Sequence, residues 1–413
     1  MGNYLQHISD RVSIVASPRL WLEDAAVQQL NTTAALPGMQ RVVGLPDLHP
    51  GRGYPVGAAF FSSGLLYPAL VGNDIGCGMG LWQTDLAAAR VKLDKLDKRL
   101  GDLDQPPDAA EWATLAQRDA ALPMALEALE EQLADAGLDS AHLRSLGTIG
   151  GGNHFAELQL IDKIGDELSD KLSDKLGEDP GAATRLAGAG LQTGCLQLLV
   201  HSGSRGLGQA VLRSHVDAFG HAGLAEHTPA ARAYLAQHAA AVRFAEVNRR
   251  LIAARIEQRL HCSAAPVLDV NHNTVLPARI DGIDGWLHRK GATPSDAGLV
   301  VLPGSRDAHS YLLEPVTAAG ALSLHSLAHG AGRKWQRGDC KGRLFKLATP
   351  DQLRRTGFGG RVICNDRALI YEEAPQAYKS VSSVLDCLVG AGLVRVLARS
   401  RPVLTYKTRG ECC

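Results

Sequence analysis

The sequence predicts one large α/β domain, and three observations support this fold class. Short apolar runs typical of strands recur from about residue 45 to residue 330, and each ends in polar or glycine-rich residues. No Pro/Ser-rich linker and no clear change of composition divides the chain. The length of 413 residues allows a large core. Although that length would also allow two or three domains, we expect residues 1–413 to form a single one.

The first predicted strands lead into loops rich in turn residues. Residues 41–57, RVVGLPDLHPGRGYPVG, are an apolar run that ends in a loop holding Asp47, His49 and Arg52. Residues 58–71 indicate two further short strands. These strands would deliver the next loop, which carries the first candidate ligands.

That next loop, residues 71–80, reads VGNDIGCGMG and places Asp74 and Cys77 three positions apart. Its four glycines allow the backbone to turn tightly. A carboxylate and a thiolate on such a turn can converge on a metal ion. The alternative for an isolated pair of this kind is a strand-to-loop turn with a buried structural cysteine.

The middle of the chain combines helical segments with a second glycine-rich loop. Residues 87–103 and 108–136 are rich in Ala, Leu, Lys and Glu, which favours helices with a solvated charged face. Residues 145–158, SLGTIGGGNHFAEL, form a glycine loop that leads into a strand. Residues 162–187 are highly charged and contain the near-repeat DELSDKLSDKLGED, so we expect a helical insertion without a chemical role.

The second half repeats the pattern of an apolar run followed by polar residues, at residues 196–208 (LQLLVHSGSRGLG), 266–273 (PVLDVNHN), 300–310 (VVLPGSRDAHS) and 323–333 (SLHSLAHGAGR). Between them, Thr228 and Pro229 are suited to begin a long alanine-rich helix that ends near His261. The C-terminal part predicts a helix over residues 377–398 and a final strand over residues 402–407.

Six residues with metal-ligating side chains follow these apolar runs, namely Asp74, Cys77, His154, His201, His272 and His329. Taken singly, a histidine at a strand end is more often a structural residue. Taken together, one carboxylate, one thiolate and several imidazoles can bind two transition-metal ions, and a thiolate can bridge two metals. The softness of this set favours Zn, Fe or Co over Mn.

Arginines beside small residues are a second recurring feature of the same segments. Arg205, Arg306 and Arg333 each lie next to glycine, serine or alanine. Small residues expose backbone N–H groups, and a guanidinium offers two donors to a phosphate. None of these segments is a Walker loop or a G-x-G-x-x-G fingerprint, so each alone is a weak signal.

The bulk composition favours a soluble cytoplasmic protein. The 43 basic residues balance 43 acidic ones, so no global field attracts nucleic acid, and a nucleic-acid partner would need a local basic patch or a site. Eight irregularly spaced cysteines do not form a disulfide framework, and we expect reduced thiols. The first residues lack the pattern of a secretory leader, and no apolar run is long enough for a membrane span.

Several segments resemble, in the same order, the motifs of the RtcB family of GTP-dependent RNA ligases. These segments are DIGCG, GGGNHFAE, HSGSRGLG, NHN, PGS, HGAGR and APQAYK. The match runs from about Pro46 to Lys407 and so covers nearly the whole chain. Several such motifs in one order form a specific signature.

The resemblance implies a single α/β domain with a deep metal-lined active-site cleft. It implies two Mn²⁺ ions and GTP as cofactors, with manganese in place of the metals that ligand softness favours. It also implies the joining of RNA 3′-phosphate or 2′,3′-cyclic phosphate ends to 5′-hydroxyl ends through a histidine–GMP intermediate. The RNA would be a broken tRNA or ribosomal RNA, and an activating protein is a further partner to consider.

The resemblance also implies roles for individual residues. The metal ligands would be Asp74, Cys77, His154, His201 and His272, with Cys77 bridging, and the guanylylated nucleophile would be His329. The nucleotide would contact Asn153, His154, Phe155, Ala156, Glu157, His272, Asn273, Pro303, Gly304, Ser305, Arg306, Ser310, His329, Gly330, Ala331, Gly332, Tyr378 and Lys407.

The sequence also departs from the family pattern in several places. The first loop reads LPDLHPGRGYPVG where a form nearer MPDVHLGKGxxIG is expected, and Lys407 is followed by six further residues where the family usually ends at Lys-Gly. These departures indicate a divergent bacterial paralogue. Two other functions remain open from the residues, a dinuclear metal phosphoesterase and an inactive RNA-binding paralogue.

Overall fold

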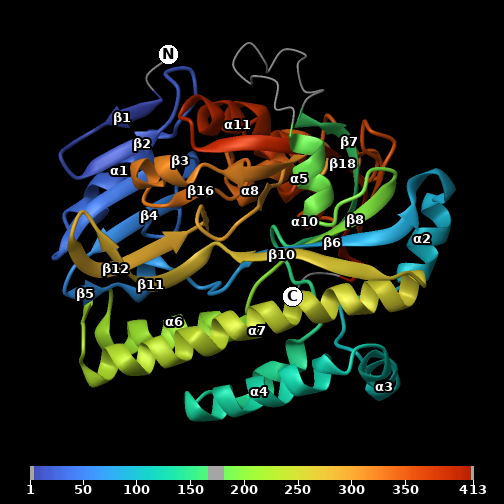
Figure 1. The fold of residues 1–413 in the computed structure, drawn as a ribbon, viewed down its shortest axis with the longest axis horizontal. Coiled ribbons are helices and arrows are strands. Elements are labelled where there is room, and N and C mark those ends of the chain that lie inside the picture. Colours follow the sequence, from blue (N-terminus) through green and yellow to red (C-terminus); the bar gives the residue numbers. More distant parts are fainter. Residues whose placement is uncertain (1–3, 166–180, 411–413) are drawn as a thin grey trace.

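The computed structural model describes residues 4–165 and 181–410, which form one domain built around two β-sheets (Figure 1). Most of the charged segment expected at residues 162–187 lies outside the described residues. Of its two ends, residues 162–164 belong to a strand and residues 182–187 to a short helix. The mixed α/β class that the sequence predicted is confirmed.

The first sheet has six strands and holds the N-terminal part of the chain. Across the sheet, the strands are β1 (Leu5–His7), β2 (Val12–Val15), β3 (Met39–His49), β4 (Val56–Ser62), β12 (Ile283–Lys290) and β11 (Asn273–Ile280). Strand β3 continues through Asp47 to His49, two residues that the sequence assigned to a loop. The strand end therefore holds them in extended backbone.

The second sheet has eight strands and carries most of the candidate ligands at its strand ends. Across it lie β10 (Ala264–Asn271), β6 (Gly78–Ala87), β8 (Cys195–Ser202), β7 (Phe155–Ile164), β18 (Val394–Thr408), β15 (Ser310–Pro315) and β14 (Val300–Leu302), and β17 (Arg361–Cys364) pairs with β18. Two small sheets pair β5 (Leu65–Leu66) with β9 (Leu224–Ala225) and β13 (Ala292–Pro294) with β16 (Ser326–Ala328).

Helices cover the outer sides of these sheets. They are α1 (Asp24–Ala34), α2 (Leu93–Leu100), α3 (Ala109–Arg118), α4 (Ala121–Asp135), α5 (Ala182–Gly188), α6 (Gly206–Phe219), α7 (Pro229–Leu260), α8 (Arg337–Leu344), α9 (Pro350–Leu353), α10 (Leu369–Glu372) and α11 (Val381–Gly390). Figure 1 shows α7 running beneath β10, with α3 and α4 on the far side of α7. Among the described residues, no helix has the length and apolar character needed to cross a membrane.

Strand β8, near the middle of the second sheet, is buried on both faces, which explains its apolar run. Side chains alternate along a strand, so neighbours in sequence face opposite layers. In β8, Leu198 shares an apolar cluster with Ile252 of α7, whereas Leu199 packs with Val301 and Leu312 on the other side. Burial on both faces therefore selects a continuous apolar sequence in place of an alternating one.

The long helix α7 was predicted almost to the residue. Thr228 accepts a hydrogen bond at its hydroxyl from the backbone N–H of Ala231 at 3.2 Å, and Pro229 occupies the first turn. A proline is tolerated there because its missing N–H would be unpaired in any case. The helix ends at Leu260, and His261 closes it in the left-handed conformation with φ of 53°.

The C-terminal helix was predicted too long. Residues 377–398 were expected to be helical, but α11 ends at Gly390 and strand β18 begins at Val394. Gly392, with φ of 73°, adopts the left-handed conformation that ends the helix. The residues that follow then pair with β15 and β7, so sheet pairing decides their conformation despite their helix-compatible composition.

Candidate active site and metal centre

Strand register brings the candidate metal ligands together. Strands β10, β6, β8 and β7 are neighbours in the second sheet, and each adjacent pair is antiparallel. Gly78, the first residue of β6, lies opposite both Ser202 of β8 and Asn271 of β10. Phe155, the first residue of β7, lies opposite His201. His201 is itself a candidate ligand, and Cys77, His154 and His272 each adjoin one of these residues. Asp74 lies three residues before Cys77 on the same loop, so the ligands meet at one edge of the sheet.

The ligand atoms form two overlapping groups that share Cys77. In one group, Nε2 of His154 lies 2.8 Å from Oδ2 of Asp74 and 3.3 Å from Sγ of Cys77. In the other, Nε2 of His201 lies 3.2 Å from Sγ of Cys77 and 3.4 Å from Nε2 of His272. Within each group the donor atoms lie within 4.8 Å of one another. The set can therefore hold metal, and Sγ of Cys77 is the atom common to both groups.

The protonation of these groups suits metal binding. Burial, followed by the neighbouring histidines, lowers the pKa of His201 and of His272 well below the usual value, so both rings are neutral. Nδ1 of His201 donates to the carbonyl of Asn153 at 3.2 Å, which leaves the Nε2 lone pair facing Cys77. Neutral imidazoles are the ligand form, and a bound cation would also favour the thiolate of Cys77.

Without a bound metal ion, burial disfavours the thiolate form of Cys77. Burial, together with the nearby Asp74 carboxylate, raises the pKa of the Cys77 thiol well above its usual value. Burial alone would also raise the pKa of Asp74, but His154 and Cys77 bring it below its usual value. The nitrogen Nδ1 of His272 is buried and has no hydrogen-bonding partner among the described residues. A carboxylate, a thiol and three imidazoles packed this closely fit a cation better than they fit one another.

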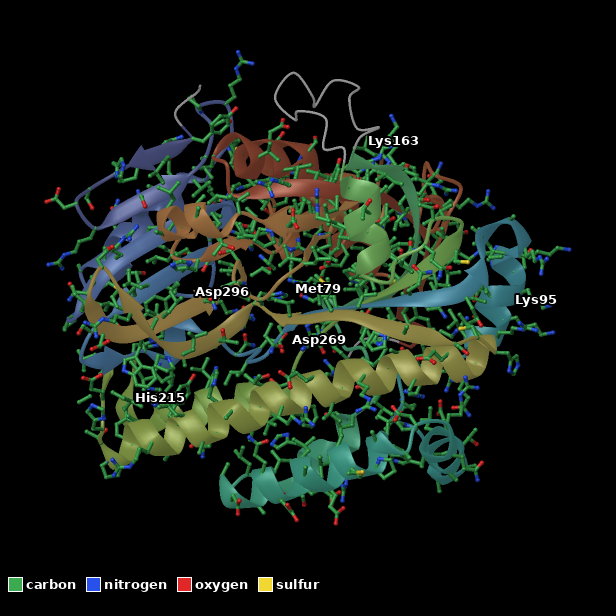
Figure 2. All side chains as sticks on the ribbon, viewed as in Figure 1. Met79, Lys95, Lys163, His215, Asp269 and Asp296 are labelled. Carbon is green, nitrogen blue, oxygen red and sulfur yellow. The ribbon has the colours of Figure 1, made fainter. Side chains whose placement is uncertain are left out.

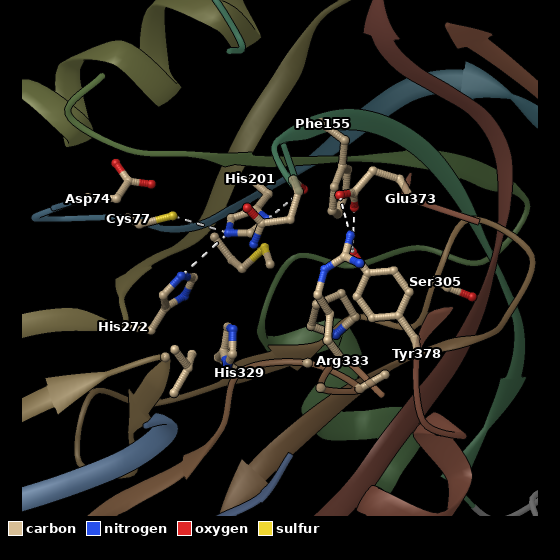
Figure 3. A pocket seen from close by; sticks show the side chains of 18 of the residues that line it. Asp74, Cys77, Phe155, His201, His272, Ser305, His329, Arg333, Glu373 and Tyr378 are labelled. Atoms are coloured by element: carbon tan, nitrogen blue, oxygen red, sulfur yellow. Dashed lines mark hydrogen bonds and ion pairs between the residues drawn. The ribbon is translucent and has the colours of Figure 1, made fainter. Parts of the chain in front are cut away.

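Four of these five ligands, all except His154, line one end of a cavity of about 320 Å³. Figure 3 shows Asp74, Cys77, His201 and His272 at that end, with His329 beside them. The opposite end holds Ser305, Arg333, Glu373 and Tyr378. Most of the residues expected to contact a nucleotide line the cavity, namely Asn153, Phe155, Glu157, His272, Asn273, Pro303, Gly304, Ser305, Arg306, His329, Gly330, Ala331, Gly332, Tyr378 and Lys407.

Three residues of the expected nucleotide set do not line this cavity. Ala156 faces an apolar cluster that includes Leu158 and Val200, on the opposite side of its strand. Ser310 lies behind the wall, where its hydroxyl accepts from the N–H of Gly304 at 3.2 Å. His154 belongs to the ligand cluster described above. Ser310 thus supports the 303–306 loop without facing the open space.

His329 is fixed at the cavity by Asp47. Its ring Nδ1 lies 2.6 Å from Oδ2 of Asp47, and its backbone N–H donates to the same oxygen at 3.1 Å. Because a carboxylate only accepts, the hydrogen-bond network assigns the proton to Nδ1 and leaves the lone pair on Nε2. The His329 ring centroid lies 4.8 Å from that of His272. An accessible imidazole nitrogen therefore lies beside the ligand cluster.

Close contacts at this site explain why two residues of the sequence motifs are glycines. A Cβ on Gly203 would lie 2.1 Å from Oδ1 of Asp74, so the HSGSR segment needs glycine to admit that carboxylate. Gly332 has φ of 74°, and a Cβ there would lie 2.2 Å from the carbonyl oxygen of Asp47. Gly332 lines the cavity, as the sequence interpretation expected, and the close approach of two backbones is a further reason for a glycine there.

Two buried carboxylates lie toward the end of the cavity opposite the candidate metal ligands. Glu157, 5% exposed, accepts from Thr405 and from Nε2 of Gln159, and burial raises its pKa. Burial would also raise the pKa of Glu373, but the cations Lys407, Arg333 and Arg337 bring it down to about 2. Glu373 is therefore a fixed anion among three cations.

Arg333 has a different partner from the one that the sequence suggested. It was expected to be available for a phosphate, but its Nη2 forms an ion pair with Oε1 of Glu373 at 2.6 Å. Its guanidinium also lies 4.9 Å from the ring centroid of Tyr378, whose hydroxyl donates to Glu373. Lys407 lies in β18 with its Nζ 3.8 Å from the same carboxylate, so the residues that follow it do not displace it from the cavity.

Sequence reasoning missed Asp47 and Glu373 as members of the site. Asp47 could have been found, because it follows the apolar run 41–45 as the ligands follow theirs. Glu373 is one of two adjacent glutamates near the end of a short helix, and no local pattern separates it from Glu372. Only the fold brings Glu373 against Arg333.

The comparisons with known proteins agree with this geometry. The model of the family described as tRNA-splicing ligase RtcB matches residues 29–408. The chain is 55% identical over 410 residues to the RNA-splicing ligase RtcB2 of Escherichia coli, covering 99% of each. It is 30% identical to the RNA-splicing ligase RtcB of Mycobacterium tuberculosis, over 91% of this chain and 99% of that one. It is also 30% identical to the tRNA-splicing ligase RtcB of Archaeoglobus fulgidus, over 92% and 91%. Family model and full-length relatives together show that the chain belongs to the RtcB family.

Proposed function

We propose that this chain is an RNA ligase that joins a 3′-phosphate or 2′,3′-cyclic phosphate end to a 5′-hydroxyl end, using GTP and two Mn²⁺ ions. The observation that carries the proposal is the position of His329. It lies beside the ligand cluster, 4.8 Å from His272 between ring centroids, and Asp47 fixes its ring. The relatives named RNA-splicing and tRNA-splicing ligases support an RNA substrate, for which broken tRNA or ribosomal RNA is the proposed class.

The chain's own residues can perform the nucleotidyl transfer. Asp47 holds the Nδ1 proton of His329, so Nε2 is the nucleophile toward the α-phosphorus of GTP. An N–P bond forms there, the P–O bond to pyrophosphate breaks, and GMP remains on His329. Asp74, Cys77, His154, His201 and His272 would hold the Mn²⁺ ions, which would neutralise phosphate charge when bound.

The remaining steps pass the GMP group to the RNA. An oxygen of the RNA 3′-phosphate attacks the phosphorus on His329, the N–P bond breaks, and the RNA end becomes activated. The 5′-hydroxyl of the second RNA end then attacks the activated 3′-phosphate and releases GMP. A cyclic phosphate end must first be opened by water to a 3′-phosphate. His329 is needed only until the RNA end is activated.

The far end of the cavity suits a guanine base. Glu157 is a buried carboxylate that can accept from N1–H and the 2-amino group of guanine, while Lys407 can donate to O6. Both side chains line the cavity, and the side chain of Lys407 is 3% exposed. Adenine has no N1 hydrogen and no 2-amino group, so this pair of groups favours GTP over ATP.

Incubation with GTP labelled at the α-phosphate, in the presence of Mn²⁺, tests the proposal. The ligase forms an acid-labile protein–GMP adduct, and His329→Ala does not. A dinuclear phosphoesterase releases phosphate from an RNA 3′ end without GTP and forms no adduct, and an RNA-binding paralogue does neither. Reactions without metal, and with Zn²⁺ or Co²⁺ in place of Mn²⁺, identify the metal. Absence of label on the wild-type protein under every metal would refute the proposal.

A further inference from the structure

One buried cation reaches the ends of three ligand-bearing strands. Arg249 projects from α7, and its side chain is 0% exposed. Its Nη1 donates to the carbonyl of Gly76 at 2.8 Å and to that of Ser202 at 3.0 Å. Its Nη2 donates to Oδ1 of Asn271 at 2.7 Å, and its Nε donates to Oδ1 of Asp269 at 2.7 Å. A single guanidinium thus connects three separate segments of the chain.

Three of the four residues that accept from Arg249 adjoin candidate ligands in sequence. Gly76 precedes Cys77, Ser202 follows His201, and Asn271 precedes His272. These three ligands make up one of the two groups of donor atoms, and Cys77 belongs to both groups. Figure 2 shows Asp269 on β10, on the side of the strand that faces α7.

We propose that Arg249 is a positioning residue, which sets the relative positions of Cys77, His201 and His272 before a metal ion binds. The inference rests on the proposed function, because it assigns a role to Arg249 at the proposed metal site. Arg249 itself does not touch the metal or the substrate in this proposal. It acts through the backbone of the strand ends, so its loss would allow the three ligands to separate.

The geometry requires arginine and not merely a positive charge. Arg249 uses Nε, Nη1 and Nη2 at once, in a planar fork that points at acceptors on three segments. A lysine has one nitrogen at the end of a flexible stem and cannot span the same three directions. Burying a cation is costly in free energy unless its donors are paired. The buried position of Arg249 is therefore stable only because all of these contacts form together.

The neighbouring residue shows that this face of α7 serves the same strand ends. Asn248 is 0% exposed, and its Nδ2 donates to Oγ of Ser202 at 3.0 Å and to the carbonyl of Gly203 at 3.3 Å. Its Oδ1 accepts from the N–H of Gly147 at 2.7 Å. Two consecutive polar residues in the middle of a buried helix both hold segments of the site, which apolar packing would not achieve.

The test compares Arg249→Met and Arg249→Lys with a matched control on the same helix. The control is Arg255→Met, since Arg255 is 1% exposed and also pairs with a carboxylate, that of Glu111 at 2.9 Å. Its other contacts reach the carbonyls of Leu103, Gln105 and Gly147, none of which adjoins a candidate ligand in sequence. Titration calorimetry gives the Mn²⁺ affinity, the absorption of bound Co²⁺ reports the thiolate ligand, and thermal unfolding gives the stability.

We expect Arg249→Met to lower Mn²⁺ affinity about tenfold or more and to weaken the Co²⁺–thiolate absorption. Arg249→Lys should restore only part of the affinity, because it keeps the charge without the fork. If Arg249→Met does not fold, the Mn²⁺ affinity of Arg249→Lys is compared with that of the wild type instead. Arg255→Met should lose stability and keep wild-type Mn²⁺ affinity.

Three results would count against the inference, and each has a different meaning. If wild-type protein binds no divalent metal, the proposed metal site fails and the inference fails with it. If wild-type protein binds Mn²⁺ and both Arg249 variants bind it equally well, only the positioning role is overturned. Equal affinity losses in Arg249→Met and Arg255→Met would also overturn it, since the effect would then be one of general stability.

Discussion

One carboxylate oxygen of Asp47 accepts two hydrogen bonds from His329, from the ring Nδ1 at 2.6 Å and from the backbone N–H at 3.1 Å. Asp47 is 0% exposed, so little water competes for this oxygen. The strand around it is held in turn by Lys379, whose Nζ donates to the carbonyls of Leu48 at 2.6 Å and Pro46 at 3.2 Å. The position and tautomer of His329 are thus set by the end of β3.

Asp47→Asn should slow guanylylation of His329 by roughly 100-fold or more, because a neutral amide does not fix the proton on Nδ1. Mn²⁺ affinity should be unchanged, since Asp47 does not belong to either group of donor atoms. The rate of protein–GMP formation and calorimetric Mn²⁺ binding give the two quantities. Guanylylation at the wild-type rate would show that Asp47 has no part in the reaction.

Much of the site could be predicted because its residues recur in one local pattern. Asp74, His201 and His272 each follow a run of apolar residues, and such runs are visible in sequence. Their convergence could not be predicted, since it depends on β6, β8 and β10 being neighbours. That order is set by pairing between segments nearly 200 residues apart, such as Gly78 with Asn271.

The elements that sequence missed are those decided by distant partners. Residues 394–398 read as the end of a helix, but β15 and β7 recruit them into β18. In the sequence, Arg249 looks like one charged residue on a helix face. Its burial is explained only by the acceptors at the strand ends that it contacts in the fold. In both cases tertiary contacts outweigh local propensity.

Removing Cys77 should affect metal binding more than removing Asp74. Cys77 belongs to both groups of donor atoms, whereas Asp74 belongs to only one. Asp74→Ala should therefore keep the group of Cys77, His201 and His272 and still bind one Mn²⁺ ion. Cys77→Ala should lose high-affinity binding of both. Equilibrium dialysis followed by elemental analysis gives the stoichiometry, and wild-type metal content in Cys77→Ala would exclude a bridging thiolate.

The stability of the fold should fall as pH drops below about 6.5, through two histidines that do not line the cavity. His238 accepts from the N–H of Val275 at 3.1 Å, and His288 accepts from that of Tyr67 at 2.8 Å. Burial lowers the pKa of each to about 4. Between pH 6.5 and 4 the unfolded chain therefore binds protons that the folded chain does not, which favours unfolding.

The contribution of each histidine to the free energy of unfolding is lost between these two pH values, up to roughly 3 kcal/mol per residue, and does not change below pH 4. Urea unfolding at a series of pH values gives the slope. His288→Gln keeps an acceptor for Tyr67 but cannot be protonated, so it should flatten the pH dependence. An unchanged slope in that variant would show that other groups account for the acid sensitivity.

The last prediction separates the role of His329 from that of the metal ligands. His329→Ala should bind Mn²⁺ as wild type does, because neither group of donor atoms contains it. It should form no GMP adduct, since the rings of His154, His201 and His272 face the ligand cluster through Nε2 and are poor nucleophiles once a metal is bound.

The same variant should still seal an RNA whose 3′ end already carries the activating GMP group. That step breaks a bond in the RNA substrate and needs only the Mn²⁺ site and a 5′-hydroxyl end. Cys77→Ala is the matched control, because it should fail in both assays. Gel analysis of sealing, with mass spectrometry of the wild-type adduct, gives both readings. GMP found on any other residue would refute the assignment, and so would ligation of a 3′-phosphate end by His329→Ala at the wild-type rate.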